Sequence, residues 1–507
     1  MKVDLILKNG NIRTMDLSQT VVRWVAIHKG KIVSLGDLDG NQPESDCCID
    51  LNGRTVLPGF IDTHTHGSLT GISLSSIDVR EDSSLEGIFE KIRARCQSTP
   101  TGGLVTVTNL AAENLKENRF PTRKELDKIS SLHPIQIHHV TMHGCVLNSL
   151  AMEIAQVDSG MRGVETYDDG SPNGILSDDT VYFEASNRIS ASTPEATIES
   201  YITSFTSSVL PKGVTTVHSL DAQDLPGDTE VWHHLMGTHP VHVVNYVESL
   251  DVDHVRALGY PRVGGCICLD GSRIMRTMAL NQPYEGSTES GALYYDDETI
   301  YRFMSRAHSL DMQFAMHAAG DRAIDQYLRI YQRVVKEQGR KNLRHRIEHF
   351  SLPSQQAIEL AAEYQIALPM QPAFAKLWDV PANSVYEKLF GRQRADRVEP
   401  FREILAAGCT VCGGSDSPVT PIDPLGGIHA LVNSPHPQRT LDITSAIKLF
   451  TINGAWAAHE ETQKGTIEVG KLADLVVLSK DPYLEQSRIK DIPVEITIVE
   501  GKIAFAV

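Results

Sequence analysis

The sequence predicts an α/β protein built on a (β/α)8 TIM barrel, with a composite β-sandwich domain from both termini and an inserted subdomain after barrel strand 1. Three observations predict this fold class. Short apolar runs alternate with helical periods, hairpin patterns occur at both ends of the chain, and one long segment interrupts the alternation near its start. Alternating strands and helices form a parallel sheet, and the closed eight-stranded barrel is its commonest form.

The two ends of the chain carry the same pattern. "LILKNGNI" and "VAIHKGKIVSLG" near one end and "TIVEGKIAF" near the other are each a short run, a turn containing glycine, and a second run. This is the sequence form of a β-hairpin. We therefore expect residues 1–56 and 458–507 to build one small β-domain, although two unrelated β-appendages would give the same pattern.

Eight apolar runs can be assigned to barrel strands, which places the barrel in residues 57–67 and 201–457. Strand one is "TVLPGFIDTHTH", and "DRAIDQYLRIYQRVV" after strand five carries the one-sided apolar stripe of a helix that covers a sheet. Strands two to eight are "GVTTVHSLD", "VHVVNYVE", "GGCICLDG", "MQFAMHAAG", "LRHRIEHF", "QIALPMQP" and "CTVCGGSD".

Residues 68–200 separate the first two barrel strands. This segment is far too long for a βα loop and contains strand-like runs of its own, "GLVTVTNL" and "IQIHHVTMHG". We expect it to form an inserted subdomain over the barrel mouth, on the side where barrel loops carry function.

The composition of the chain disfavours some classes of partner and suggests where in the cell the protein is found. The net charge of -17 disfavours a nucleic-acid partner, because phosphate binding needs a basic surface. No apolar run is long enough to span a membrane, and Asp4 and Lys8 lie where a secretory signal would be apolar. We therefore expect a cytoplasmic protein with a small-molecule substrate and no membrane partner, and leave a homodimer open.

Eight cysteines in 507 residues are too sparse for a disulfide scaffold. Cys409 and Cys412 form a CxxC motif, but they lie on a predicted strand, where their spacing points the two side chains to opposite faces. A redox or zinc-ribbon role is therefore not expected for this pair.

Histidines and one carboxylate gather at predicted strand ends. His64 and His66 share one strand face, so both can point into the barrel mouth. Alone, this pair is weak evidence in a chain with 20 histidines, because most histidines only form hydrogen bonds. Three other strand ends supply the same residue types, namely His317, His349 and Asp416. Imidazole with carboxylate suits a divalent ion, with Zn²⁺ favoured and one or two ions per chain.

A catalytic ion of this kind would lower the pKa of a bound water towards about 7. By its position, Asp416 can take the proton of that water and pass it to a leaving group. The alternative is that Asp416 only caps the helix after strand eight.

Several long motifs, in order, resemble the amidohydrolase superfamily. Within it the chain is similar to the YtcJ-like branch, amidohydrolase family 3, which includes N-substituted formamide deformylase. The resemblance spans nearly the whole chain and implies a metal-dependent hydrolase. It implies that His64, His66, His317 and His349 are metal ligands and that Asp416 is both ligand and proton shuttle. The motifs are "VLPGFIDTHTHG", "MHAAGDRAID", "RHRIEH", "GSDSPVTPIDPLGGI" and "GTIEVGKLADLVVL".

One position departs from the family pattern. Where relatives carry a lysine on strand four, carboxylated so that it bridges two metals, this chain has Cys266 in "GGCICLDGS". A thiolate is a good zinc ligand, but the short side chain bridges two ions only if the strand lies closer to them. Cys266 is therefore a candidate ligand. The sequence slightly favours the alternative, a small buried cysteine beside a one-metal site.

Other residues are predicted to lie above the site. His143 in "TMHGCVLN" is a candidate catalytic residue that donates a hydrogen bond to a developing oxyanion, and a structural histidine is the alternative. His218 follows strand two, Arg273 follows strand four, and Phe374 and Trp378 follow strand seven. These four are candidate substrate-binding residues, an anion clamp and an aromatic wall among them, although ordinary packing would also explain them.

The sequence thus predicts a metal-dependent amidohydrolase acting on a C–N bond other than a peptide bond. Metal-bound hydroxide would attack the carbonyl carbon, and Asp416 would return the proton to the leaving nitrogen. The alternatives are a mononuclear-metal deaminase of a heterocycle or amidine, which releases ammonia, and a metal-dependent decarboxylase, which releases carbon dioxide. A catalytically inactive scaffold is a further alternative, disfavoured because all four histidines and Asp416 are present.

Overall fold

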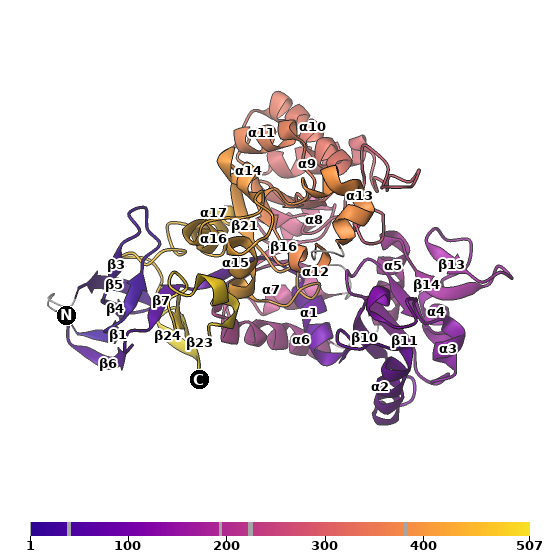
Figure 1. Ribbon diagram of the computed structural model, residues 1–507, viewed down its shortest axis with the longest axis horizontal. Coiled ribbons are helices and arrows are strands. Elements are labelled where there is room, and N and C mark those ends of the chain that lie inside the picture. The colour runs from indigo at the N-terminus through magenta and orange to yellow at the C-terminus, as the bar shows by residue number, and fades with distance from the viewer. Residues whose placement is uncertain (1, 38–41, 192–194, 222–226, 380–383) are drawn as a thin grey trace.

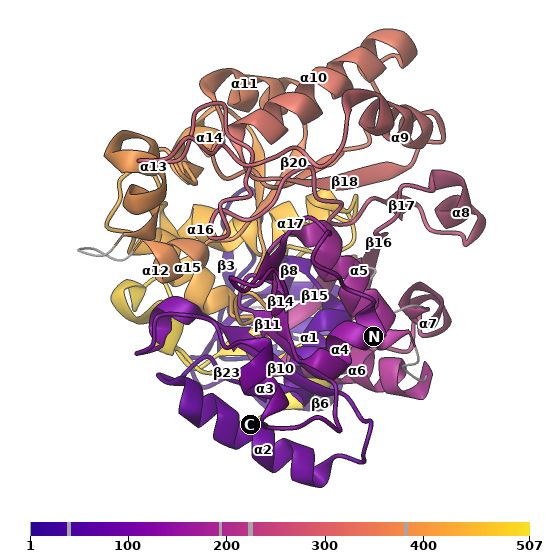
Figure 2. The same cartoon turned by 90° about the vertical axis from the view of Figure 1, so that its right-hand side faces the viewer.

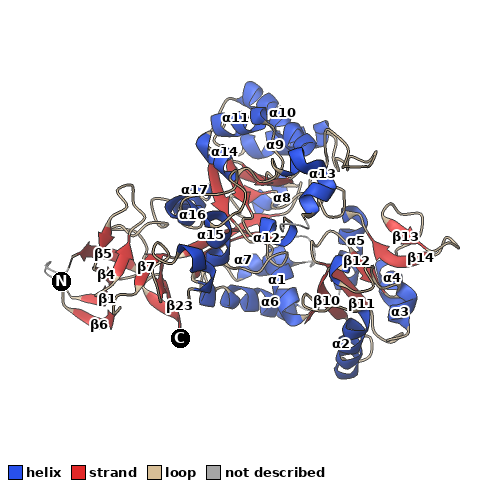
Figure 3. Cartoon of the chain, viewed as in Figure 1, coloured by secondary structure: helices blue, strands red, loops and turns tan. Residues whose placement is uncertain are grey.

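The computed structural model describes residues 2–507 except 38–41, 192–194, 222–226 and 380–383. Along the longest axis in Figure 1, a β-domain lies at one end, the barrel in the middle and a second α/β unit at the other end. Figure 3 shows the same division: strands dominate the end that holds both termini, and helices surround the middle. Within the described residues, no helix is both long enough and apolar enough to cross a membrane.

The barrel is an eight-stranded parallel sheet in the predicted order. Its two ends meet, since Thr65 forms a parallel bridge with Ser417 and Thr63 Oγ1 donates to the carbonyl oxygen of Gly413 at 2.9 Å. The strands are β8 (Phe60–Thr65), β15 (Val214–Asp221), β16 (His242–Val247), β17 (Arg262–Val263), β18 (Gln313–Ala318), β19 (Arg346–His349), β20 (Ala367–Met370) and β21 (Thr410–Gly413).

Helices connect these strands and cover the sheet. They are α7 (Asp228–His234), α8 (Val252–Ala257), α9 (Asp297–Ser309), α10 (Asp321–Gln338), α11 (Gln355–Glu363), α12 (Phe374–Trp378), α13 (Val385–Ala395), α14 (Phe401–Ala406), α15 (Pro424–Val432), α16 (Ile443–Leu449) and α17 (Ile452–Ala457).

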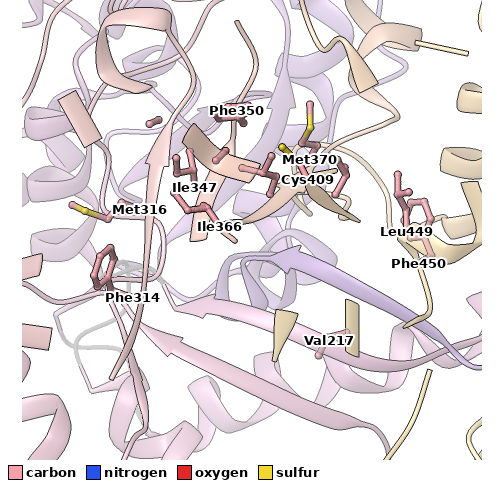
Figure 4. Close-up of a cluster of buried hydrophobic side chains, with 14 of the residues drawn as sticks. Val217, Phe314, Met316, Ile347, Phe350, Ile366, Met370, Cys409, Leu449 and Phe450 are labelled. Atoms are coloured by element: carbon pink, nitrogen blue, oxygen red, sulfur yellow. The ribbon is translucent and has the colours of Figure 1, made fainter. Parts of the chain in front are cut away.

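Because side chains alternate along each strand, the barrel has one apolar face and one polar face. Phe314 and Met316 of β18 and Ile347 of β19 belong to the main apolar core, part of which Figure 4 shows. The residues between them face the other way, and on β19 these are Arg346 and Glu348, both fully buried. The barrel therefore has an apolar outer layer and a strongly polar interior.

Two predicted strands differ from the observed ones. The first is divided at Gly59 into β7 (Thr55–Pro58), which joins the β-domain, and β8 in the barrel. The fourth strand is only two residues long, so the run predicted as strand "GGCICLDG" lies beyond its end, a correction to the prediction. The cause is the pair Gly264 and Gly265, whose positive φ values of 99° and 53° turn the chain out of the extended conformation.

Both ends of the chain build the β-domain, as expected for a composite sandwich. β7 from the N-terminal part pairs antiparallel with β22 (Leu475–Leu478) from the C-terminal part, with Val56 opposite Val477. One sheet has the order β5-β4-β1-β6 and the other the order β24-β23-β22-β7-β2-β3. The remaining strands are β1 (Val3–Lys8), β2 (Asn11–Arg13), β3 (Val21–Val22), β4 (Trp24–His28), β5 (Lys31–Gly36), β6 (Ser45–Asp50), β23 (Val494–Val499) and β24 (Lys502–Ala506).

The segment between β8 and β15 folds around its own six-stranded sheet, in the order β13-β14-β12-β11-β10-β9. Viewed from its side, this insertion lies in front of β8 and β15 (Figure 2). Its strands are β9 (Ile77–Asp78), β10 (Val105–Leu110), β11 (Ile135–His139), β12 (Cys145–Leu147), β13 (Val164–Thr166) and β14 (Pro172–Leu176). Its helices are α1 (Gly67–Ser75), α2 (Leu85–Ser98), α3 (Arg123–Asp127), α4 (Ser149–Ala155) and α5 (Asp179–Ser190). The last helix before β15, α6 (Glu195–Ser208), packs into the main core of the barrel through Ile198, Ile202 and Phe205.

Candidate metal centre

Three of the predicted ligands meet at the carboxyl ends of β8 and β21. Nε2 of His64 and Nε2 of His66 each lie 3.1 Å from the same oxygen, Asp416 Oδ1. Ligand atoms bound to zinc at about 2.0–2.2 Å with a tetrahedral angle lie about 3.4 Å apart, so this spacing is close to that of a metal site. The backbone sets it, because Asp416 N donates to His64 O at 2.7 Å and Asp416 itself has a φ of 59°.

The other two histidines complete a cluster of four rings. The His349 ring centroid lies 4.7 Å from that of His64 and 4.3 Å from that of His317. Strand alternation alone would point His349 away from the barrel interior, because its neighbour Glu348 points inward. A φ of 71° at His349 changes that direction at the end of β19. The rings therefore come together from strands β8, β18 and β19.

Three of the four imidazoles, those of His64, His66 and His349, have Nδ1 held by an acceptor and Nε2 left on the other side of the ring. This arrangement fixes the tautomer and the ring orientation of metal-binding histidines. The pairs are His64 Nδ1 with Glu348 Oε2 at 2.7 Å, His66 Nδ1 with Leu220 O at 3.1 Å, and His349 Nδ1 with Gln371 Oε1 at 2.9 Å. His317 Nε2 lies 3.4 Å from Asp270 Oδ1 without a hydrogen bond between them.

Glu348 is itself held by a buried guanidinium. Arg346 Nε donates to Glu348 Oε1 at 2.7 Å, and both side chains are fully buried. Arg346 Nη1 also donates to His218 Nδ1 at 3.0 Å. His218 therefore lies inside the barrel, below the mouth, and does not line either cavity described below. It contacts Arg346, where the sequence had suggested contact with a substrate.

The charges of the cluster favour a cation. Burial disfavours ionisation of Asp416, yet the His64 and His66 rings beside it hold its pKa well below the usual range. Burial likewise disfavours a charged His64, yet Asp416 and Glu348 raise its pKa to about 9. Burial and the charge on His317 hold the pKa of His349 well below the usual range, so that ring is neutral, as a ligand must be.

Two adjoining cavities open above the cluster, under the insertion. His143, in the β11–β12 connection, lies over the mouth with its ring centroid 5.8 Å from that of His317. Both cavities are lined by His143, His317, His349 and Asp416; Cys266 and Cys268 line one, and Arg273, Phe374 and Trp378 line the other. The insertion thus contributes directly to the walls of the site.

Arg273 binds protein groups in this second cavity. Its Nη1 donates to Glu399 Oε1 at 2.6 Å and to the Tyr386 hydroxyl at 2.7 Å, and its Nη2 donates to Ser351 Oγ at 2.7 Å. The guanidinium carbon lies 5.1 Å from the Phe374 ring centroid. Arg273 therefore packs against the aromatic wall formed by Phe374 and Trp378, and its role as an anion clamp stays a prediction.

The donor set fits a divalent ion by an observation independent of the sequence motif. His64 Nε2 is completely buried; Asp416 Oδ1 lies 3.1 Å away, but no described residue makes a hydrogen bond to this nitrogen. Such a buried polar atom is rare in native proteins and calls for an unseen partner. Four imidazoles, a carboxylate and nearby thiols are the ligands that Zn²⁺ and similar ions take.

Comparison with known proteins agrees with this geometry. The model of the amidohydrolase family matches residues 48–505. The chain belongs to the amidohydrolase family. This amidohydrolase is 28% identical to YtcJ of Bacillus subtilis, over 90% of each chain. It is 26% identical to the N-substituted formamide deformylase of Arthrobacter pascens, over 99% of this chain and 98% of that protein.

Among solved structures, the amidohydrolase resembles an uncharacterized metal-dependent hydrolase from Pyrococcus horikoshii OT3. The TM-score is 0.77, with 24% identity over 95% of this chain and 99% of that one. At this identity the likeness establishes the shared fold.

Four residues of this amidohydrolase centre were not predicted as part of it: Glu348, Gln371, Asp270 and Cys268. Glu348 directly precedes a predicted ligand, and an acidic residue at that place could have been noticed. Gln371 reaches His349 from the end of β20, and Asp270 lies near His317 from the segment after β17, so no local pattern marks either residue.

Proposed function

We propose that this amidohydrolase hydrolyses an amide-type C–N bond, other than a peptide bond, with one or two divalent ions held by His64, His66, His317, His349 and Asp416. The observation that carries the proposal is the cluster of four imidazoles beside Asp416, three of them with one ring nitrogen bound by an acceptor. Similarity to a formamide deformylase over nearly the whole chain supports the C–N bond.

An ion at this centre would supply two effects, acidification of a water molecule and polarisation of the substrate carbonyl, and Zn²⁺ suits the nitrogen, oxygen and sulfur donors present. The remaining steps belong to the protein. Asp416 is ionised and almost completely buried, so it can accept the proton of the attacking water without competition from bulk solvent.

The proton on Asp416 then passes to the leaving nitrogen, which departs as an amine. His143 lies above the cluster and can donate a hydrogen bond to the oxygen on which negative charge develops. Phe374 and Trp378 form an apolar wall beside the same cavity, which favours a substrate with an apolar group next to the amide.

The proposal is tested by the variant His64→Ala/His66→Ala, with His234→Ala on the exposed surface of α7 as a matched control. Metal content and amine release from a panel of N-substituted formamides and other small amides are measured together. We expect the double variant to lose both the ion and turnover, and His234→Ala to keep both. Metal content unchanged in the double variant would refute the ligand assignment. Release of ammonia without carbonyl-containing acid would identify a deaminase.

A further inference from the structure

Two thiols lie on the opposite side of the mouth from Asp416. The ligand atoms of Cys266, Cys268 and His317 all lie within 4.8 Å of one another. Cys266 Sγ also belongs to a second such group, with His64 and His349. One sulfur atom is therefore common to two groups of potential ligands.

A turn of two glycines brings this short side chain into the mouth. A Cβ at Gly264 would lie 2.2 Å from Ala315 O, and one at Gly265 would lie 2.7 Å from Tyr246 O. Only glycine allows the backbone to pass so close to both neighbouring strands. The backbone after this turn places Cys266 in the wall of the cavity, beside the histidines. The residue is 6% exposed.

Backbone pairing fixes the second thiol beside His317. Cys268 forms a parallel bridge with His317. On either side of it, His317 N donates to Ile267 O at 3.0 Å and Leu269 N donates to His317 O at 3.0 Å. Paired residues on neighbouring strands point to the same face, so Cys268 and His317 face the cavity together.

The sulfur–nitrogen spacing suits an ion better than a direct hydrogen bond. Cys266 Sγ lies 3.9 Å from His317 Nδ1, at the outer limit for a bond to sulfur. Zinc bonds of about 2.3 Å to sulfur and about 2.0–2.1 Å to nitrogen, at a tetrahedral angle, put these atoms about 3.6 Å apart. Glu248, at the end of β16, lines the same cavity and adds an oxygen donor to its wall.

We propose that Cys266, Cys268 and His317 hold a second divalent ion, with Cys266 placed to be shared with an ion at His64 and His349. The inference rests on the proposed function and deepens it, because it assigns a thiolate side to the metal centre. Binding converts two thiols to thiolates and releases their two protons to solvent. Sulfur donors select Zn²⁺, Cd²⁺ or Co²⁺ over Mg²⁺ at this side.

Cobalt loading of the full-length protein tests the proposal under reducing conditions. Thiolate bound to Co²⁺ gives a near-ultraviolet charge-transfer band that imidazole and carboxylate do not give. We expect two ions per chain and this band in the wild type. Cys266→Ser/Cys268→Ser should lose the band and one ion, whereas His64→Ala/His66→Ala should lose an ion and keep the band. Cys96→Ser, in the helix α2 of the insertion, is the matched control and should keep both.

Alkylation of the unmodified protein gives a second readout that does not depend on a variant's folding. Zinc should protect Cys266 and Cys268 from a small alkylating reagent, and chelation should remove the protection. The exposed Cys47 and Cys48 should react equally in both states. A wild type that holds one ion, without the band and without protection, overturns this inference and leaves the proposed function intact. A wild type that holds no ion overturns both.

Discussion

The two sides of the barrel mouth differ in their candidate ligand atoms and in the backbone conformation that positions them. On one side His64, His66 and Asp416 form a nitrogen and oxygen group at the ends of regular strands. On the other side Cys266 and Cys268 bring sulfur atoms towards His317 from an irregular segment beyond a two-residue strand. The first side depends on strand alternation, and the second depends on a glycine turn that breaks it.

This difference teaches that one barrel mouth can present two sets of candidate donor atoms, nitrogen and oxygen in one and mainly sulfur in the other. A long side chain reaches the centre from a regular strand, and a short one reaches it only when the backbone moves inward. Gly264 and Gly265 permit that movement because they pack directly against the carbonyl oxygens of β18 and β16. In the proposed thiol site, the glycine turn and the two cysteines would therefore act together.

The largest effect is expected on the nitrogen and oxygen side. Asp416→Asn keeps the shape of the side chain but removes its ability to carry a proton. We expect the hydrolysis rate to fall by about 10²- to 10⁴-fold, while the protein stays folded and keeps ion bound. Single-turnover amine release and metal content are measured on the same sample. A variant with more than about a tenth of the wild-type rate would disprove the shuttle role.

An intermediate effect is expected from the groups that orient the ligands. Gln371→Leu removes the acceptor from His349 Nδ1 and frees the ring to rotate. We expect the affinity for the ion to fall by about 10- to 100-fold, measured by competition with a chelator of known affinity. Gln355→Leu, on the exposed surface of α11, is the control. Equal affinity in the two variants would mean that Gln371 has no orienting role.

Much of the fold, and the gathering of the candidate ligands at the barrel mouth, could be predicted from the sequence. The apolar runs that alternate with helical segments predicted the order of the eight strands. The alternation of side chains along a strand predicted that His64 points into the barrel mouth. His349 was recognised from its motif. The direction of its side chain depends on a left-handed backbone conformation, which the alternation of residues along a strand does not predict. Glu348 is hydrogen-bonded to His64, but the two residues are 284 positions apart in the sequence, so only the folded barrel brings them together.

The thiol side was beyond sequence reasoning for a related reason. Cys266 was expected on a regular strand, where its side chain is too short to reach the centre. The run of two glycines before it did not reveal how closely the backbone approaches β16 and β18. Arg273 was a candidate anion clamp, a role that stays a prediction, and the sequence did not reveal its bond to Glu399, 126 residues away.

The smallest effect is expected from the turn itself. Gly264→Ala places a Cβ against Ala315 O at a φ of 99°, whereas Gly286→Ala has a similar φ of 67° but open space around it. If about 1 kcal/mol of the added strain acts on Cys266, affinity for the thiol-side ion falls about fivefold. Cobalt titration of the two variants measures this difference. Equal affinities would show that the turn does not position the thiol.

The central claim is that hydrolysis depends on ions held at this mouth. Its most direct test is the rate of amine release measured against bound ion as the wild-type protein is stripped with a chelator and reloaded with Zn²⁺. The account predicts that the rate falls to background on stripping and returns in proportion to the ion restored. A rate that stays unchanged when the bound ion has been removed would contradict it.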